Sequence, residues 1–312
     1  MAPITPPPDP VSLTTLARLL GDRALAEFRQ AWPHRSWLLP ADAERARALS
    51  TLLPLDLKAL LRAAPWKQIR LFAPSAEGRL VNCLVTPRQA WALFGPGVTL
   101  EIYHLERFLP QLGQLARALE DELEVERGRC HVQAFASRGG MGFPLHFDKS
   151  EVLTIQLAGR KRWWFAGPEV RYPTCGYESG KPIIGELGEY WPRQSAVSPA
   201  HRPADEREVV LEPGAVIHLP RGHWHRTETL DPGSLSLSLT FVVSTQTFAE
   251  RALEELRRRL LRSAEWRATC VPSATDRAHA RELLASLGRL AGSIDADDLL
   301  AVTPITKEGQ DL

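Results

Sequence analysis

Apolar residues recur at helical spacing in the first part of the chain. Residues 108–123 carry Leu109, Leu112, Leu115 and Leu119, and a repeat of three to four residues predicts an amphipathic helix. The same periodicity, bounded by proline and glycine, predicts helices at residues 12–32, 41–53, 56–63 and 87–94. Short runs rich in apolar residues predict strands at residues 37–39, 68–73, 79–85 and 98–105.

From about residue 130 the pattern changes to short apolar segments separated by turn residues. Pro213-Gly214 and Asp231-Pro232-Gly233 are typical of such turns. We expect strands at residues 131–137, 145–148, 152–157, 161–165, 208–211, 215–219, 223–228 and 234–243. Short strands with this punctuation predict a sandwich or jelly roll, an architecture that includes the cupin barrels. The predicted fold class is therefore α+β with a mainly β core.

Other segments lie outside these strands. Residues 1–11 are proline-rich and predict a disordered tail, and residues 168–207 form an insertion long enough to be a binding lid. Beyond residue 246 the pattern is helical again. We expect one domain at residues 12–246 and a helical region at residues 247–312. Four leucines of that region predict a homodimer interface: Leu253, Leu256, Leu260 and Leu261.

Composition narrows the possible partners and compartments. The 312 residues have a net charge of +1, which gives no reason to expect direct binding of nucleic acid or a membrane surface. No apolar run reaches the roughly 18 residues that a spanning helix requires. The four cysteines form no CxxC pair, and the N-terminus lacks the basic-then-apolar pattern of a signal peptide. These features favour a cytoplasmic protein.

Two histidine-containing segments carry the candidate chemistry. His146 and Asp148 lie two residues apart on a predicted strand, so their side chains share one face. His223 and His225 share a face of a later strand, and by spacing alone either could supply a third metal ligand. Two imidazoles and one carboxylate form the metal-binding triad of non-haem Fe(II) oxygenases. The alternative is a set of surface histidines beside a solvated aspartate.

Lys161 lies in the basic and aromatic segment Gly159-Arg160-Lys161-Arg162-Trp163-Trp164-Phe165. On a strand, Lys161 shares its face with Trp163 and Phe165, where a buried ammonium is costly unless a carboxylate pairs with it. A dicarboxylate cosubstrate would supply that partner. The alternative is a solvated basic run on a strand edge.

The segment Ser234-Leu235-Ser236-Leu237-Ser238-Leu239-Thr240-Phe241 alternates without a break between hydroxyl and apolar side chains. This period of two residues predicts a strand. Its hydroxyl face is either exposed to solvent or lines a polar barrel interior, where it could bind a cosubstrate carboxylate.

Taken together, these motifs resemble the JmjC-type, cupin-like Fe(II)/2-oxoglutarate oxygenases. The resemblance rests on His146-Phe147-Asp148, on residues 156–163 and on Leu219-Pro220-Arg221-Gly222-His223-Trp224-His225. It covers about residues 15 to 245, and within the family it is similar to the bacterial ribosomal-protein hydroxylases. It implies a double-stranded β-helix with helices before and after it.

The resemblance also implies roles for individual residues. It implies iron ligation by His146, Asp148 and His225, with His223 in a position where the family has an aromatic residue. Lys161 would pair with the distal carboxylate of 2-oxoglutarate, and the same resemblance places Ser137 and Ser236 among the cosubstrate-supporting positions.

The implied reaction uses Fe(II), 2-oxoglutarate and O2 to hydroxylate a side chain of a protein or peptide, including ribosomal proteins, with release of succinate and CO2. The alternatives are a small-molecule hydroxylase on the same scaffold and a metal-binding cupin without turnover.

Overall fold

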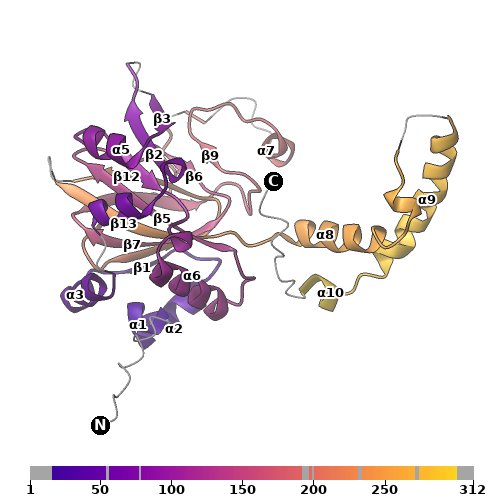
Figure 1. Cartoon of the computed structure of the whole chain (residues 1–312), viewed down its shortest axis with the longest axis horizontal. Helices are drawn as coiled ribbons and strands as arrows, with labels where there is room; N and C mark the ends of the chain where they lie inside the picture. The colour runs from indigo at the N-terminus through magenta and orange to yellow at the C-terminus, as the bar shows by residue number, and fades with distance from the viewer. Residues whose placement is uncertain are drawn as a thin grey trace, which may run out of the picture. The chain divides into compact units, whose positions relative to one another are not determined.

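The computed structural model describes residues 16–53, 56–76, 79–191, 197–198, 200–230, 234–270 and 274–300 (Figure 1). The chain divides into two compact units, one up to Ser244 and one from Thr245 onward. The predicted tail at residues 1–11 and the predicted turn at residues 231–233 lie outside the described residues.

The first unit is built on two antiparallel sheets. The larger has the order β1-β11-β7-β13-β5-β4-β2-β3, and the smaller has the order β10-β8-β12-β6-β9. The larger sheet comprises β1 (Trp37–Leu39), β2 (Ile69–Pro74), β3 (Leu80–Leu84), β4 (Thr99–Ile102), β5 (Cys130–Arg138), β7 (Glu151–Ala158), β11 (Val216–Leu219) and β13 (Leu235–Val243). The smaller comprises β6 (His146–Phe147), β8 (Lys161–Pro168), β9 (Tyr177–Glu178), β10 (Arg207–Leu211) and β12 (His223–Thr229). This arrangement agrees with the predicted jelly roll.

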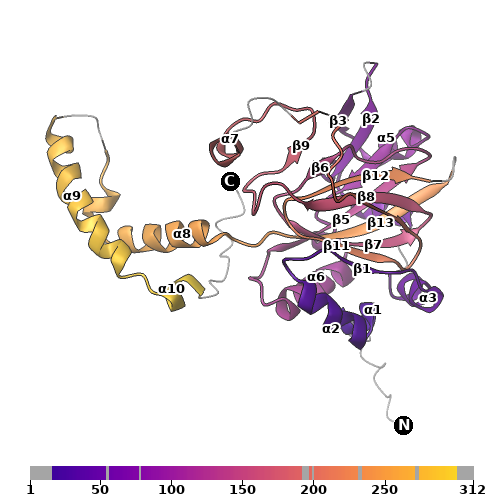
Figure 2. The same ribbon diagram turned by 180° about the vertical axis from the view of Figure 1, so that it is seen from behind.

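Helices cover one face of the larger sheet, and the main core lies between the helices and this sheet. Figures 1 and 2 show α1, α2, α3 and α6 along the same side of the sheets. The helix α6 (Pro110–Glu122) contributes buried leucines, whereas β13 contributes Leu237, Leu239 and Phe241 to the same cluster. Because side chains alternate along a strand, the hydroxyl face of β13 must point away from the helices, toward the smaller sheet. The other helices of this unit are α1 (Leu16–Leu20), α2 (Asp22–Ala31), α3 (Ala43–Leu52), α4 (Leu57–Ala63), α5 (Pro87–Leu93) and α7 (Glu186–Tyr190).

Two predicted elements are interrupted or shortened relative to the sequence pattern. The helix expected over residues 12–32 is interrupted at Gly21, whose φ of 84° is outside the helical region. The strand expected over residues 98–105 stops at Ile102, because His104 adopts a left-handed conformation with a φ of 54° and begins a short 3₁₀ turn, η2 (Leu105–Arg107).

The long insertion between β8 and β10 has a core of its own. Tyr177, Leu187 and Trp191 pack with Phe147 and Trp224, which belong to β6 and β12. The insertion is therefore fixed against the two strands that carry the candidate histidines. A large aromatic cluster of this kind gives the segment a defined position that length alone does not reveal.

The second unit is helical, with α8 (Phe248–Leu260), α9 (Ala274–Gly292) and α10 (Ala296–Leu300). Thr247 and Glu250 form a capping box that begins α8. Arg259 pairs with Glu255 on its own helix and with Asp298 on α10, so ion pairs connect the helices of this unit. No helix in the described part of the chain is long and apolar enough to span a membrane.

Candidate active site

The smaller sheet brings His146 and His225 side by side on neighbouring strands. His225 on β12 is the antiparallel register partner of His146 on β6, and directly opposed residues have Cβ atoms about 5 Å apart. Adjacent residues reinforce this register. The backbone N–H of Thr227 donates to the carbonyl of Phe143 at 3.0 Å, and the N–H of Phe143 donates to the Thr227 hydroxyl at 3.0 Å. A Cβ at Gly142 would lie 1.8 Å from the Thr227 carbonyl oxygen, so this close approach requires glycine.

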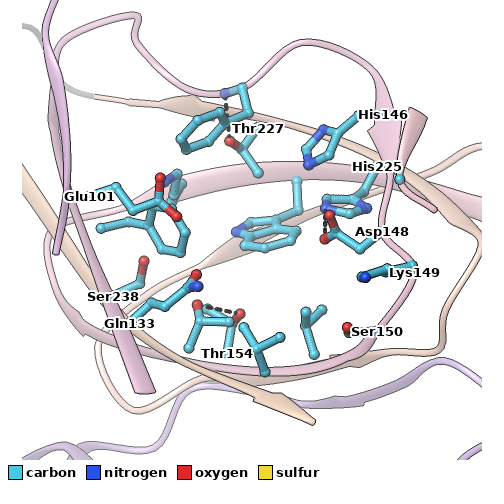
Figure 3. Close-up of a pocket in the computed structure, with 18 residues that line it drawn as sticks. Glu101, Gln133, His146, Asp148, Lys149, Ser150, Thr154, His225, Thr227 and Ser238 are labelled. Carbon is cyan, nitrogen blue, oxygen red and sulfur yellow. Dashed lines mark hydrogen bonds and ion pairs between the residues drawn. The ribbon is translucent and has the colours of Figure 1, made fainter. Parts of the chain in front are cut away.

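Asp148 completes a cluster of three potential ligands. Its Oδ2 lies 3.6 Å from His225 Nε2, and the ring centroids of His146 and His225 are 4.1 Å apart. One ligand atom from each residue lies within 4.8 Å of the others. Figure 3 shows the three side chains converging at one end of the cavity. Atoms bound to one metal ion at about 2.0–2.2 Å lie at most about 4.4 Å apart, and the 3.6 Å between Asp148 and His225 is within that range, so the residues fit a metal ion.

Backbone carbonyls orient both imidazoles. The carbonyl of Pro144 lies 2.7 Å from Nδ1 of His146, and the carbonyl of His223 lies 3.0 Å from Nδ1 of His225. A carbonyl only accepts, so each Nδ1 carries the proton and each Nε2 presents a lone pair. Burial and the nearby His146 lower the pKa of His225 to about 4. Its ring is therefore neutral at pH 7, the form that a metal requires.

The structure shows which of His223 and His225 lies with His146 and Asp148, a choice that the spacing in the sequence left open. On β8, the partner strand of β12, the register shifts between His223 and Trp224, so that Gly167 is an extra residue. His225 lines the cavity and His223 does not.

The cavity between the sheets has a volume of about 300 Å³. The larger sheet contributes polar side chains to its wall, and the smaller sheet contributes the histidines and Trp163, whose ring stacks on His225 at 5.8 Å. Thr154 and Thr240 bond to each other at 2.9 Å on this wall. The residues that line the cavity include Glu101, Gln133, Phe135, Phe143, Lys149, Ser150, Thr154, Thr227, Ser238 and Thr240 (Figure 3).

Lys161 lines the same cavity and is 2% exposed. It lies on β8, four residues from Phe165, which is the register partner of His225. Four residues of a strand span about 13 Å. Its ammonium lies 5.9 Å from the centre of the Phe135 ring, and no carboxylate forms an ion pair with it in the described part of the chain. Burial lowers its pKa from 10.5 to about 8. The cavity thus has a metal-binding cluster at one end and a buried cation farther along.

Ser137 and Ser236 do not line the cavity. The Ser137 hydroxyl bonds to Thr229 at 2.7 Å, and the Ser236 hydroxyl accepts from Nε2 of Gln156 at 2.9 Å. The hydroxyl face of β13 does reach the cavity, but through Ser238 and Thr240. Of the two alternatives for this face, the structure therefore selects the interior, where Ser236, Ser238 and Thr240 are buried. The sequence does not show where along the strand the cavity ends.

Several cavity residues were not predicted from the sequence. Gln133 and Phe135 lie two residues apart on β5, and Thr154 lies on β7. Their strands were expected, but only the pairing of β13 with both β5 and β7 shows that these side chains face the histidines.

Two antiparallel sheets around a cavity, with two imidazoles and one carboxylate gathered in it, define a cupin-type double-stranded β-helix with a facial donor set. Sequence comparison finds a related family. The JmjC domain matches residues 102–250, a little under half of the chain.

Individual proteins support this relationship. The chain is 31% identical over 200 residues to the uncharacterized protein YxbC of Bacillus subtilis, covering 63% of this chain and 59% of YxbC. It is 29% identical over 170 residues to the bifunctional lysine-specific demethylase and histidyl-hydroxylase NO66 of Drosophila mojavensis, covering 53% of this chain and 17% of NO66. The matched part of the chain thus spans less than two thirds of the length of these relatives.

A solved structure shows the same fold. The Escherichia coli ribosomal oxygenase YcfD in complex with cobalt and 2-oxoglutarate aligns with a TM-score of 0.52 at 16% sequence identity. The alignment covers 84% of this chain and 66% of that chain. Together with the two sheets described above, it confirms the predicted fold class.

The buried ammonium of Lys161 should destabilise the protein when nothing pairs with it. Below its pKa of about 8 the group is charged in both the folded and the unfolded chain, and the folded state bears the full cost of burial. Between about pH 8 and 10.5 only the unfolded chain holds the proton, so the contribution of this group to stability rises with pH.

We therefore expect Lys161→Met to raise the free energy of unfolding at pH 7, by on the order of 2–3 kcal/mol, and the gain to shrink as the pH approaches 10. Urea titrations of the metal-free protein at pH 7 and pH 9.5 measure this. The exposed Lys58 on α4 provides the matched control, and Lys58→Met should change neither value appreciably. A gain that is absent, or equal at both pH values, would contradict the account of Lys161.

Proposed function

We propose that this protein is an Fe(II)- and 2-oxoglutarate-dependent dioxygenase that hydroxylates a side chain of a protein or peptide and releases succinate and CO2. The observation that supports it best is the presence of two complementary features in one cavity. His146, Asp148 and His225 offer a three-ligand set, and Lys161 offers a buried cation along the same wall.

In this proposal each residue has a separate task. His146, Asp148 and His225 would hold ferrous iron through two Nε2 atoms and one carboxylate oxygen. Lys161 binds the far carboxylate of 2-oxoglutarate, which gives its buried charge the partner that it otherwise lacks. Thr154 and Thr240 lie on the facing wall and present hydroxyls to the cosubstrate. The iron and 2-oxoglutarate, when bound, supply the activation of O2 and the oxidising power of the reaction.

The remaining walls keep the reaction dry and oriented. Phe135, Phe143 and Trp163 line the cavity, and aromatic walls exclude water from a reactive centre. The Trp163 ring also fixes the plane of His225 by stacking on it. Ser137 and Ser236 support the site indirectly. The Ser137 hydroxyl bonds Thr229 on β12 of the other sheet, and the Ser236 hydroxyl bonds Gln156 on the neighbouring strand β7.

A protein substrate is favoured over a small molecule by the relatives and by the rim. NO66 is described as a histidyl-hydroxylase and YcfD as a ribosomal oxygenase. The insertion beside the cavity exposes large side chains, with Tyr172 at 61% and Ile184 at 75% exposure. Such a surface suits a peptide segment better than a small ligand that must be enclosed. A ribosomal substrate would place the enzyme in the cytoplasm.

Turnover of 2-oxoglutarate tests the catalytic proposal. Iron-loaded protein in air should form succinate, and His146→Ala should abolish it. Lys161→Met should raise the KM for 2-oxoglutarate by roughly thirtyfold or more, because removing one partner of a buried ion pair costs about 2–5 kcal/mol. Lys58→Met should leave both parameters unchanged. Succinate formation that is equal in wild type and His146→Ala would rule out the proposed centre.

The substrate class is tested in cells. Ribosomal proteins from cells that contain the gene should carry one additional oxygen atom on a side chain, and this mass shift should be absent when the gene is deleted or replaced by His146→Ala. Intact-protein and peptide mass spectrometry measure it. An active enzyme whose deletion changes no protein mass, but changes a small hydroxylated metabolite, would favour the small-molecule alternative.

We further propose that the helical region from residue 247 forms a homodimer. Leu253 on α8 is 66% exposed and Phe248 is 74% exposed, although Leu256 and Leu260 are partly buried within the unit. Apolar side chains exposed together favour association. Native mass spectrometry at micromolar concentration should show a dimer that Leu253→Glu weakens, and a wild-type protein that is only monomeric would contradict this proposal.

A further inference from the structure

A second cluster of potential metal ligands lies outside the cavity. His104 and Glu106 belong to the segment that leaves β4, and His131 is near the start of β5. None of the three lines the cavity. One ligand atom from each lies within 4.8 Å of the others, which makes this the second three-residue cluster of its kind among the described residues. The proposed oxygenase reaction does not use it.

The distances suit one ion better than a set of strong hydrogen bonds. Oε1 of Glu106 lies 3.1 Å from Nδ1 of His104 and 3.3 Å from Nδ1 of His131. A charge-assisted hydrogen bond to a carboxylate is usually about 2.7–2.9 Å, and here two rings share a single oxygen. Ligands at about 2.0–2.1 Å from a tetrahedral ion are about 3.3 Å apart. The observed distances of 3.1 and 3.3 Å therefore fit ligands around one metal ion.

The carboxylate is held in position by the backbone. Its other oxygen, Oε2, accepts the backbone N–H of Val132 at 2.8 Å, so the chain next to His131 fixes the orientation of Glu106. An oriented second oxygen is the usual support of a carboxylate ligand.

One neighbour opposes a cation. Nε of Arg107 lies 3.7 Å from the same Oε1, and its side chain is 48% exposed. Because so much of this side chain is in water, it can turn outward at little cost. Arg107 therefore lowers the affinity of the cluster for a metal without blocking it. Removing the Arg107 side chain should then strengthen metal binding.

We propose that His104, Glu106 and His131 form a second divalent-cation site that takes Zn²⁺ through two Nδ1 atoms and one carboxylate oxygen. Imidazole and carboxylate are ligands that zinc prefers. The side chains of His104 and His131 are 30% and 32% exposed, so water reaches the remaining coordination position. The ion joins the end of β4 to β5, two strands whose residues Glu101 and Phe135 line the cavity.

Zinc binding is measured on the full chain carrying His146→Ala and Asp148→Ala, which removes the first cluster. Equilibrium dialysis followed by elemental analysis should find one zinc per chain. Mutating a residue that only supports a metal ligand typically weakens metal affinity by roughly 10–100-fold. Adding His131→Ala removes a ligand itself and should weaken zinc binding by more than that. Adding Arg107→Ala should strengthen it about fivefold, because a competing charge at about 4 Å is removed.

His201 provides the matched control, because it pairs with Glu169 at 2.7 Å and belongs to no three-residue cluster in the described part of the chain. His201→Ala should leave zinc binding unchanged. Zinc should also raise the melting temperature of the His146→Ala/Asp148→Ala protein and not that of its His131→Ala derivative. The proposal is overturned if the background protein binds no zinc, if His131→Ala and His201→Ala have equal effects, or if Arg107→Ala weakens binding. Since Arg107→Ala keeps all three ligands, its result does not depend on whether a histidine variant folds.

Discussion

The antiparallel pairing of β6 with β12 is the constraint on which the proposed centre depends. β6 has only two residues, so its own ladder cannot fix a register. The reciprocal bonds between Phe143 and Thr227, and the absence of a side chain at Gly142, hold the preceding loop against β12. The aromatic cluster of the insertion packs on Phe147 from the other side. These contacts place His146 opposite His225, and Asp148 follows because it is two residues further along.

The cavity carries a cost to stability that makes sense only for function. A lysine that is 2% exposed, with no described carboxylate partner, is unfavourable in the folded protein. Nearby, polar side chains such as Gln133, Thr154 and Ser238 occupy positions where a purely structural core would use apolar ones. A bound diacid that reaches from the metal ligands toward Lys161 would satisfy these groups together. In the proposed function, the lysine that weakens the empty protein is the group that pairs with the bound diacid.

Local sequence patterns predicted much of this arrangement. Alternation along a strand placed His146 with Asp148 and Lys161 with Trp163, and the hydroxyl face of β13 was recognised before its surroundings were known. What could not be predicted depends on pairing between distant strands. The extra residue Gly167 lies on β8, so nothing near His223 or His225 in the sequence distinguishes them. Ser137 and Ser236 lie on the expected strands but beyond the cavity wall. The cluster of His104, Glu106 and His131 arises from the left-handed turn at His104 and the pairing of β4 with β5.

The central claim is that one cavity holds both a metal ion and a keto-diacid. A crystal structure of the protein grown without oxygen, with Mn(II) in place of iron and with 2-oxoglutarate, tests it most directly. The account predicts a metal bound by His146, Asp148 and His225, with the far carboxylate of the acid within hydrogen-bonding distance of Lys161 Nζ. A metal that is not bound by His225, or an acid that leaves Lys161 without a partner, would contradict it.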